Sequence, residues 1–273
     1  MFPVYLNIFG FELHTYGLMV ASGFALGIYI AFERTKRLGL NSEITLDTGL
    51  VLLVSAMAGG RLLYVLLDVK YYISNPGEII FQRGGFVFYG GVIFSIIIAW
   101  VYLKKKGVSF LEYADLFAPS IAIGHSLGRW GCLFQGCCFG KITHSFLGVK
   151  FPLIIKNHFV IGSPAAIHHL NLNLIDSNSN GSLPIHPVQI YESIGELIIF
   201  FILIYLSRRK HFKGLVFSGY IILYGILRFG DESFRGDDRG SYLFGLSPAQ
   251  WISALSIFAI LSSYFLYFKK QPR

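Results

Sequence analysis

Seven apolar stretches separated by polar segments form the main pattern of this chain. An α-helix needs about 20 largely apolar residues to cross a membrane, and the stretches span approximately residues 16–32, 46–67, 86–103, 111–130, 188–206, 215–229 and 248–268. The fourth and sixth end in charged or glycine-rich sequence, so their bounds are the least defined. The pattern predicts an all-α polytopic membrane protein with about seven transmembrane helices.

Composition supports this prediction. The chain has 273 residues, of which 54% are hydrophobic and 14% are charged, whereas soluble proteins carry about 25% charged residues. The formal net charge is +8. Because most lysines and arginines lie in short loops beside apolar stretches, we attribute this charge to membrane topology and expect no nucleic-acid partner. We expect a single transmembrane domain over residues 1–273.

The basic clusters predict the orientation of the helices. They follow the first, third, fifth and seventh stretches: Arg34/Lys36/Arg37, Lys104/Lys105/Lys106, Arg208/Arg209/Lys210/Lys213 and Lys269/Lys270/Arg273. The positive-inside rule places all four on the cytoplasmic side, with the N-terminus outside and the C-terminus inside. We expect no cleavable signal peptide, because no basic segment precedes the first apolar stretch.

The segment 141–187 falls outside the membrane in this topology and is too long to be a turn. Residues 147–152 alternate like a short strand, and residues 153–161 can pair with them. Residues 176–182 are typical of a turn or a mobile tip. We therefore expect a small extracytoplasmic appendage over residues 141–187.

Small residues recur at helical spacing in three of the stretches. Such residues allow helices to approach closely in lipid, and they are Gly23/Gly27, Ser55/Gly59 and Ser120/Gly124/Gly128. Close packing alone accounts for them, so we assign them no chemistry.

Three arginines lie inside or at the edge of apolar stretches: Arg61, Arg129 and Arg228. A charge at the bilayer centre costs about 2.5–3.5 kcal/mol on insertion scales, so such residues are usually paired or functional. Arg61 suits a structural brace as well as a functional role. We favour function for Arg129 and Arg228, whose guanidinium groups can bind a phosphate in a bidentate fork.

Acidic residues follow Arg228 at helical spacing. If the segment is helical, Arg228/Glu232 and Asp231/Arg235 form i,i+4 pairs, and Tyr224 lies one turn below Arg228. Glu232 can then hold the arginine or accept a proton. A solvated ion pair explains Asp231/Arg235 equally well.

Candidate bases and phenolic donors lie near the same predicted membrane face. The histidines are His14, His125 and His186, of which His125 lies one turn before Arg129. Each of them also suits a structural hydrogen bond. Tyr16 and Tyr89 can donate to a lipid headgroup or belong to an interfacial aromatic belt. The glycine pairs that bracket Tyr89 in the segment 84–91 favour close backbone approach there.

All three cysteines fall within seven residues: Cys132, Cys137 and Cys138. A thiolate metal site, a disulfide and a catalytic thiol are each possible. Adjacent cysteines are poorly spaced for tetrahedral zinc, so we favour packing as small apolar side chains and expect no metal.

Several segments together make the chain resemble the bacterial prolipoprotein diacylglyceryl transferases. They cover most of the chain in the family's order: His14-Thr15-Tyr16-Gly17-Leu18-Met19, residues 84–91, Gly128-Arg129-Trp130-Gly131, His186-Pro187-Val188-Gln189-Ile190-Tyr191-Glu192, and Arg228-Phe229 with Glu232. The resemblance implies a seven-helix bacterial inner-membrane enzyme. Such an enzyme moves diacylglyceryl from phosphatidylglycerol to the lipobox cysteine of a prolipoprotein, forming a thioether and releasing glycerol phosphate.

The resemblance also assigns roles to residues. The expected catalytic residues are Arg129, Arg228, Glu232 and Tyr89, together with His125, which is included for its one-turn spacing to Arg129 and not from the resemblance. The expected phosphatidylglycerol-binding residues are Arg129, Tyr16, Arg228, Gly131, Gly140, Gln135 and Arg61. The partners are phosphatidylglycerol, the prolipoprotein and the lipid bilayer, and no metal or organic cofactor is required.

This chain departs from the family's commonest pattern in four places. Cys132 and Gln135 stand where asparagines are usual, and Cys137 takes an acidic position. Tyr89 stands where many members have histidine. If that histidine is the base, His125 can compensate here, because it lies one turn from Arg129.

Two other functions fit the same pattern. One is a related membrane transferase that moves a lipid or polyprenyl group to a different acceptor. The other is a non-enzymatic protein that binds or transports an anionic lipid. A transporter often contains an internal repeat, and this chain shows none.

Overall fold

The computed structural model describes residues 4–8, 11–81, 85–156, 159–209, 212–238, 240 and 242–270. Gly84, Lys210 and Arg273, which belong to segments discussed above, lie outside these residues.

Every predicted membrane stretch falls on a helix: α1 (Thr15–Leu38), α2 (Ser42–Leu67), α5 (Phe88–Lys105), α6 (Phe110–Gln135), α8 (Val188–Ser207), α9 (Leu215–Asp231) and α10 (Pro248–Lys270). The short helices are α3 (Val69–Ser74), α4 (Glu78–Phe81), α7 (Pro164–Asn171) and the 3₁₀ helix η1 (Glu232–Phe234).

Five of the helices are long and apolar enough to cross a membrane, within the part of the chain that the structure describes. They are α1, α2, α5, α8 and α10 as far as Phe265. The other two predicted spans fall outside this set: α6 contains Pro119 and Arg129, and α9 has 17 residues. The protein is thus a predominantly helical, multi-pass membrane protein.

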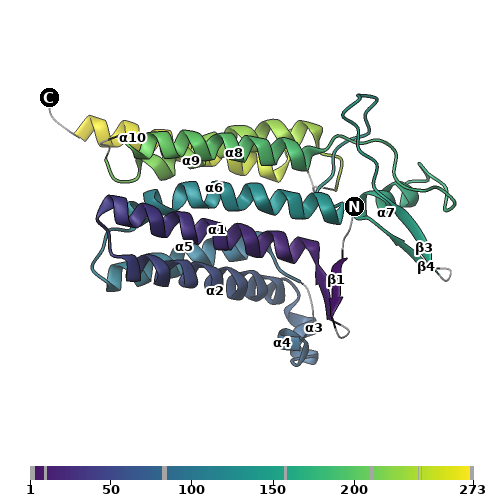
Figure 1. The fold of residues 1–273 in the computed structure, drawn as a ribbon, viewed down its shortest axis with the longest axis horizontal. Helices are drawn as coiled ribbons and strands as arrows, with labels where there is room; N and C mark the ends of the chain where they lie inside the picture. Colours follow the sequence, from purple (N-terminus) through teal and green to yellow (C-terminus); the bar gives the residue numbers. More distant parts are fainter. Residues whose placement is uncertain are drawn as a thin grey trace. The chain divides into compact units, whose positions relative to one another are not determined.

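The chain divides into two compact units, and the boundaries between them fall inside α1 and inside α6. One unit comprises Ile28–Leu116, and the other comprises Met1–Gly27 and Phe117–Arg273. Each is described separately below, and Figure 1 shows the elements of both.

In the unit 28–116, α2 packs along α5 through glycines (Figure 1). A Cβ added to Gly59 would lie 2.3 Å from Phe94 Cβ and 2.6 Å from the Gly90 carbonyl oxygen. The Ser55 hydroxyl also donates to Ser95 Oγ at 3.4 Å. The expectation of close helix approach is therefore confirmed at Ser55/Gly59 and at Gly90, one of the glycines that bracket Tyr89.

Arg34 differs from the other members of its basic cluster. Its side chain is buried, and its guanidinium donates to the carbonyl oxygens of Asp115 and Leu116. Lys36 instead is exposed and pairs with Glu33. Arg34 thus joins α1 to α6 within this unit and does not extend to a headgroup.

In the other unit, the helices α8, α9 and α10 lie side by side (Figure 1). Their apolar core includes residues of α6, α8 and α9: Ala118, Ala122, Ile199, Leu203, Val216 and Tyr220. This core fixes the mutual rotation of α6, α8 and α9, and so determines which of their side chains face each other.

Glycines in the first half of α1 bring this helix against α6. A Cβ added to Gly23 would lie 2.7 Å from the Gly124 carbonyl oxygen, and one added to Gly27 would lie 3.0 Å from that of Ser120. Gly128 differs, because an added Cβ there would meet no described atom within 4 Å. The packing interpretation is confirmed for Gly23, Gly27 and Gly124 but is wrong for Gly128.

The segment 141–187 contains a hairpin of β3 (Leu153–Lys156) and β4 (Phe159–Gly162), together with α7. The predicted strand over 147–152 is wrong. Val149 and Pro152 form only isolated bridges, to Ile185 and Gly181, because a proline has no N–H with which to extend a ladder. The predicted turn over 176–182 is confirmed by the Ser179 N–H, which donates to the Asp176 carbonyl at 2.9 Å.

A second hairpin precedes α1 and was not predicted. It pairs β1 (Val4–Ile8) with β2 (Phe11–His14) in antiparallel register. Each strand is only four or five residues long, which is too short for alternation to be distinguished from the adjoining apolar helix.

Candidate active site

Arg129 and Glu192 form the central ion pair of the unit that contains α6, α8 and α9. Arg129 Nη2 donates to Glu192 Oε1 at 2.5 Å, and Glu192 has no exposed surface. Arg129 lies in the last two turns of α6, and Glu192 lies in the second turn of α8. A fully buried carboxylate requires such a partner, because an unpaired one is strongly disfavoured in an apolar interior.

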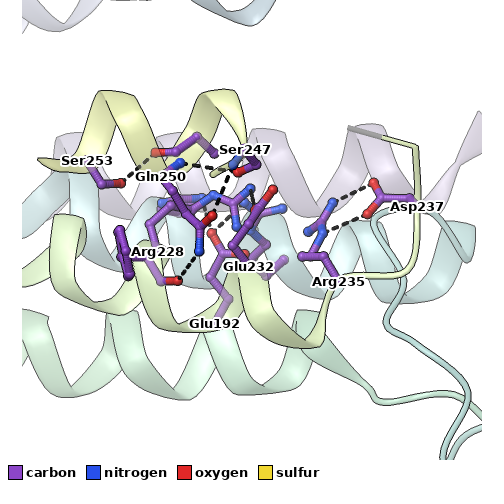
Figure 2. A network of polar contacts seen from close by, with 12 residues as sticks. Glu192, Arg228, Glu232, Arg235, Asp237, Ser247, Gln250 and Ser253 are labelled. Atoms are coloured by element: carbon purple, nitrogen blue, oxygen red, sulfur yellow. Dashed lines mark hydrogen bonds and ion pairs between the residues drawn. The ribbon is translucent and has the colours of Figure 1, made fainter. Parts of the chain in front are cut away.

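Arg228 and Glu232 form the second pair (Figure 2). Arg228 Nη2 lies 2.7 Å from Glu232 Oε2, and both side chains are buried. This i,i+4 pair confirms the sequence prediction. It spans the end of α9 and the start of η1.

The expected Asp231–Arg235 pair does not form. Figure 2 shows Arg235 turned instead to Asp237, with Nε and Nη2 donating to both carboxylate oxygens at 2.8 and 2.7 Å. The cause is the backbone: η1 ends at Phe234, and Arg235 has extended φ/ψ of −68° and 138°. Helical i,i+4 spacing therefore does not continue to Arg235.

Each arginine of the two pairs retains a buried donor atom without a described partner. These atoms are Nε of Arg129 and Nη1 of Arg228. Buried acceptors without a described partner include Glu192 Oε2 and Asp231 Oδ2. Buried polar atoms normally have hydrogen-bond partners, so the cluster is suited to a ligand that offers both acceptors and donors, such as a phosphate ester bearing hydroxyl groups.

His125 lies beside the same carboxylates. Its Nδ1 is 2.6 Å from Glu196 Oε1, and its Nε2 is 3.7 Å from Glu192 Oε1. The imidazole ring also packs edge-on against Tyr224, with centroids 5.1 Å apart. A carboxylate beside Nδ1 favours the tautomer with its proton on that nitrogen and so leaves Nε2 as the basic nitrogen, which is the arrangement of a histidine general base.

Helical spacing brings these groups together. His125 and Arg129 lie one turn apart on α6, and Glu192 and Glu196 lie one turn apart on α8. Between them, the Ser126 hydroxyl donates to the Ser193 carbonyl at 2.9 Å and fixes the two helices in register. The polar stripes of α6 and α8 therefore face each other inside an apolar bundle.

Two further expected residues lie near the end of α6. A Cβ added to Gly131 would lie 3.2 Å from Tyr16 Cδ2, so the Tyr16 ring covers this glycine. Tyr16 also lies close enough to Arg129 to interact with its charge. Tyr16, Gly131 and Arg129 are thus brought together.

Gly140 and Gln135 have different surroundings. The backbone of Gly140 bridges to Arg235, and an added Cβ would lie 2.4 Å from the His186 carbonyl oxygen. Gly140 therefore allows close passage of three backbone segments. Gln135 is the last residue of α6 and is partly buried.

Arg61 and Tyr89 belong to the unit 28–116. Arg61 donates to the carbonyl oxygens of Ile79 and Gly85 at 2.8 and 3.2 Å. It thereby ties α2 to α4 and to the segment after α4, which favours the bracing role. Tyr89 lies in the first turn of α5, is 44% exposed and packs against Phe88.

The other candidate histidines lie elsewhere. His186 Nδ1 is 3.3 Å from the Tyr191 hydroxyl, and its ring packs against Phe234. His14 is the last residue of β2. The histidine that lies among the buried carboxylates is His125.

Sequence reasoning gave no role to Glu192, Glu196 or Tyr220. Both glutamates have no exposed surface, and Tyr220 stacks on Tyr224 with centroids 5.8 Å apart. The signal was available for the acids, because Glu192 and Glu196 are charges spaced one turn apart in an otherwise apolar stretch. Such residues are functional-site candidates in a membrane helix.

The three cysteines form a cluster just beyond this site. Their sulfur atoms lie within 4.8 Å of one another, and all three are free thiols. Cys132 is buried, as expected for packing, whereas Cys137 and Cys138 are partly exposed.

Comparison with known proteins identifies similar chains. A profile of the family described as "Prolipoprotein diacylglyceryl transferase" matches residues 3–266. A protein of Clostridium tetani (strain Massachusetts / E88) is 36% identical over 99% of this chain and 100% of its own length. One from Finegoldia magna is 34% identical over 93% of this chain and 90% of its own length. Both relatives are named phosphatidylglycerol–prolipoprotein diacylglyceryl transferase.

Proposed function

The chain belongs to the prolipoprotein diacylglyceryl transferase family, and we propose that Arg129 and Arg228 act in that reaction. The protein is a transferase of lipoprotein maturation, which moves the diacylglyceryl group of phosphatidylglycerol to a prolipoprotein. The acceptor is the lipobox cysteine thiol, and the products are a thioether and glycerol phosphate.

The observation that carries this proposal is the pair of open donors on Arg129 and Arg228. Each guanidinium is held by one glutamate and keeps a buried N–H without a described partner. Arg129 and Arg228 both lie close enough to Tyr224 to interact with it electrostatically. Two guanidinium groups close to the same tyrosine suit a phosphodiester, whose oxygens accept charge-assisted hydrogen bonds.

Arg129 and Arg228 also stabilise the leaving group. When the carbon–oxygen bond of the diacylglyceryl carbon breaks, its electron pair stays with the glycerol phosphate oxygen. Negative charge therefore grows on the phosphate in the transition state, where fixed guanidinium groups stabilise it more than in the ground state. Glu192 and Glu232 hold the arginines so that little reorganisation accompanies this step.

His125 takes the proton of the attacking thiol. The thiolate is the nucleophile, and the basic nitrogen Nε2 is oriented by the contact between Nδ1 and Glu196. The sulfur then bonds to the diacylglyceryl carbon as the glycerol phosphate departs. The proton on His125 is available for the leaving phosphate oxygen, so the imidazole returns to its starting state.

The membrane arrangement follows from the sequence. We place α6 and α9 across the membrane with the five apolar spans, which gives seven spans with the N-terminus outside. The basic last turns of α1 and α5, with Lys36/Arg37 and Lys104/Lys105, support this orientation in the bacterial inner membrane. Residues 141–187 then face outward, where an open hollow of about 650 Å³ lined by Lys150, Asn180 and Leu183 is suited to contact the preprotein.

A direct transfer assay tests this function. Purified full-length protein is incubated with phosphatidylglycerol and a lipobox peptide, and the mass of the peptide is measured. The proposal expects a diacylglyceryl adduct on the cysteine, and a peptide with Cys→Ala should gain no mass. Intact lipid bound without any adduct would instead indicate a lipid-binding protein.

Arginine variants test the phosphate contacts. Arg129→Gln and Arg228→Gln should each abolish transfer, whereas Arg209→Gln, which alters an exposed arginine after α8, should not. Helical content by circular dichroism must match the unchanged protein. Full transfer by a folded Arg129→Gln or Arg228→Gln protein would overturn the assigned role.

A further inference from the structure

The end of α6 brings two cysteines together through its capping geometry. Gly136 has φ +74°, and its N–H donates to the Leu133 carbonyl at 3.1 Å. The Cys137 N–H donates back to the Cys132 carbonyl at 3.2 Å. These two bonds define a Schellman cap, in which the side chains of Cys132 and Cys137 are the pair that normally make contact. A separation of five residues therefore becomes direct proximity.

Cys138 completes the cluster through an unusual backbone conformation. Its φ is +56°, although only glycine adopts this region readily. Non-glycine residues in it cost of order 1–3 kcal/mol and are concentrated at functional sites. The conformation brings the third sulfur to within 4.8 Å of those of Cys132 and Cys137.

The surrounding structure holds this turn in place. Gln189 Nε2 donates to the Cys137 carbonyl at 2.7 Å, and the Ala165 N–H donates to the Gly136 carbonyl at 3.2 Å. A Cβ added to Gly136 would lie 2.6 Å from Ser163 Cβ, so no larger residue fits there. The three thiols are thus pre-arranged by α8 and by the segment 151–165.

The sulfur separations suit a thiolate-bound cation. Zinc–sulfur bonds of about 2.3 Å place tetrahedral ligand sulfurs about 3.8 Å apart. The observed upper limit of 4.8 Å therefore needs only a small rotation about the cysteine side-chain bonds. Cys137 and Cys138 are partly exposed, which leaves a path for a cation to enter.

Positive charge lies beside the cluster. Arg235 lies close enough to Cys138, and Arg129 close enough to Cys132 and Cys138, to interact electrostatically with these side chains. Three thiolates and one divalent cation carry a net charge of −1, which these arginines can neutralise.

We propose that Cys132, Cys137 and Cys138 form a binding site for one soft, thiophilic cation of the Zn²⁺ or Cu⁺ class. The three sulfurs bind the cation and release their protons to solvent. Water or a further donor fills the fourth position of Zn²⁺, whereas Cu⁺ accepts thiolates alone. This site lies outside the arginine cluster and does not depend on the proposed transfer mechanism.

From the sequence, the adjacency of Cys137 and Cys138 argues against chelation. Sequence spacing alone does not show the Schellman cap, which brings the sulfur atoms together. Simple packing explains Cys132, which is buried. It does not explain the left-handed conformation of Cys138 or the partial exposure of Cys137 and Cys138. A metal site accounts for the burial of Cys132, the left-handed conformation of Cys138 and the partial exposure of Cys137 and Cys138.

Titration of the purified, reduced, full-length protein with Cd²⁺ tests the proposal. Cadmium thiolates absorb in the ultraviolet by charge transfer, so the band reports both binding and the number of sulfurs. We expect saturation at one cation per chain, displacement by Zn²⁺, and proton release during binding. Each of Cys132→Ser, Cys137→Ser and Cys138→Ser should weaken the band and lower affinity by at least the ~10–100-fold typical of outer-shell changes.

Controls separate this site from other metal-binding groups. His144→Ala removes an exposed histidine of the outer segment and should leave the band and the affinity unchanged. If a cysteine variant does not fold, the unchanged protein still tests the proposal, because one equivalent of Zn²⁺ should raise its thermal midpoint. Absence of saturable Cd²⁺ binding, or a band that survives replacement of all three cysteines, would overturn the proposal.

Discussion

Arg129 on α6 and Glu192 on α8 are joined by a 2.5 Å contact between Nη2 and Oε1, and the carboxylate is fully buried. Neither residue can be accommodated alone in an apolar bundle, because removing one partner of a buried pair leaves an uncompensated charge. The pair therefore ties the position of the arginine to the packing of two helices.

Glu192→Gln should destabilise the protein by about 3–5 kcal/mol, because the Arg129 guanidinium loses its buried counter-ion. Added phosphatidylglycerol should restore part of the loss, since its phosphate can replace the carboxylate as the partner of the arginine. Thermal unfolding in detergent, with and without the lipid, measures both effects.

Phosphatidylcholine vesicles are the control for the Glu192→Gln experiment, because the positively charged headgroup offsets the phosphate. Equal protection by the two lipids would show that Arg129 does not bind the anionic headgroup. An unchanged unfolding midpoint for Glu192→Gln would show that the ion pair does not stabilise the fold.

Arg228→Lys should retain part of the activity that Arg228→Gln loses. Lysine keeps the positive charge but lacks the planar fork that can contact Glu232 and a phosphate oxygen together. We expect kcat/KM for peptide lipidation to fall by about 10–100-fold, which corresponds to the 1.5–3 kcal/mol of a charged hydrogen bond. Arg209→Lys, at an exposed site, is the matched control and should have unchanged kinetics.

Long apolar stretches were sufficient to predict the seven long helices of the described chain, but not the short helices α3, α4 and α7. All seven stretches are helical, because their residues are apolar over lengths that suit a membrane and are ended by charge or glycine. The Arg228–Glu232 pair was also predictable, since it depends only on helical spacing. The Asp231–Arg235 pair was not, because the backbone leaves helical geometry after Phe234.

Contacts between distant segments could not be read from the sequence. The partners of Arg129 and His125 are Glu192 and Glu196, more than 60 residues away on another helix. Their proximity depends on the rotation of α6 against α8, which the apolar core and the Ser126–Ser193 hydrogen bond fix. Spacing alone therefore identified the arginine and the histidine but not the acids that hold them.

Gly59→Val should destabilise the packing of α2 on α5. Even the first side-chain carbon would lie 2.3 Å from Phe94 Cβ, so the helices must separate. Overpacking of this kind costs about 1–3 kcal/mol, which thermal unfolding can measure. Gly17→Ala is the control, because an added Cβ meets nothing within 4 Å there and alanine favours a helix; equal destabilisation by both changes would contradict the packing argument.

Glu196→Gln should reduce kcat for peptide lipidation with little change in KM for phosphatidylglycerol. Glu196 Oε1 lies 2.6 Å from His125 Nδ1, so it orients the imidazole and is not among the proposed phosphate contacts. General-base catalysis contributes about 10²–10⁴-fold, and His125→Asn should lose most of this factor. Glu196→Gln should lose less and should change the shape of the pH–kcat profile, whereas Glu196→Asp should restore part of the rate.

Steady-state kinetics across pH, with circular dichroism as the control for folding, measure these effects. A Glu196→Gln protein with unchanged kcat and an unchanged pH profile would exclude Glu196 as a positioning residue, and full activity of His125→Asn would exclude His125 as the base.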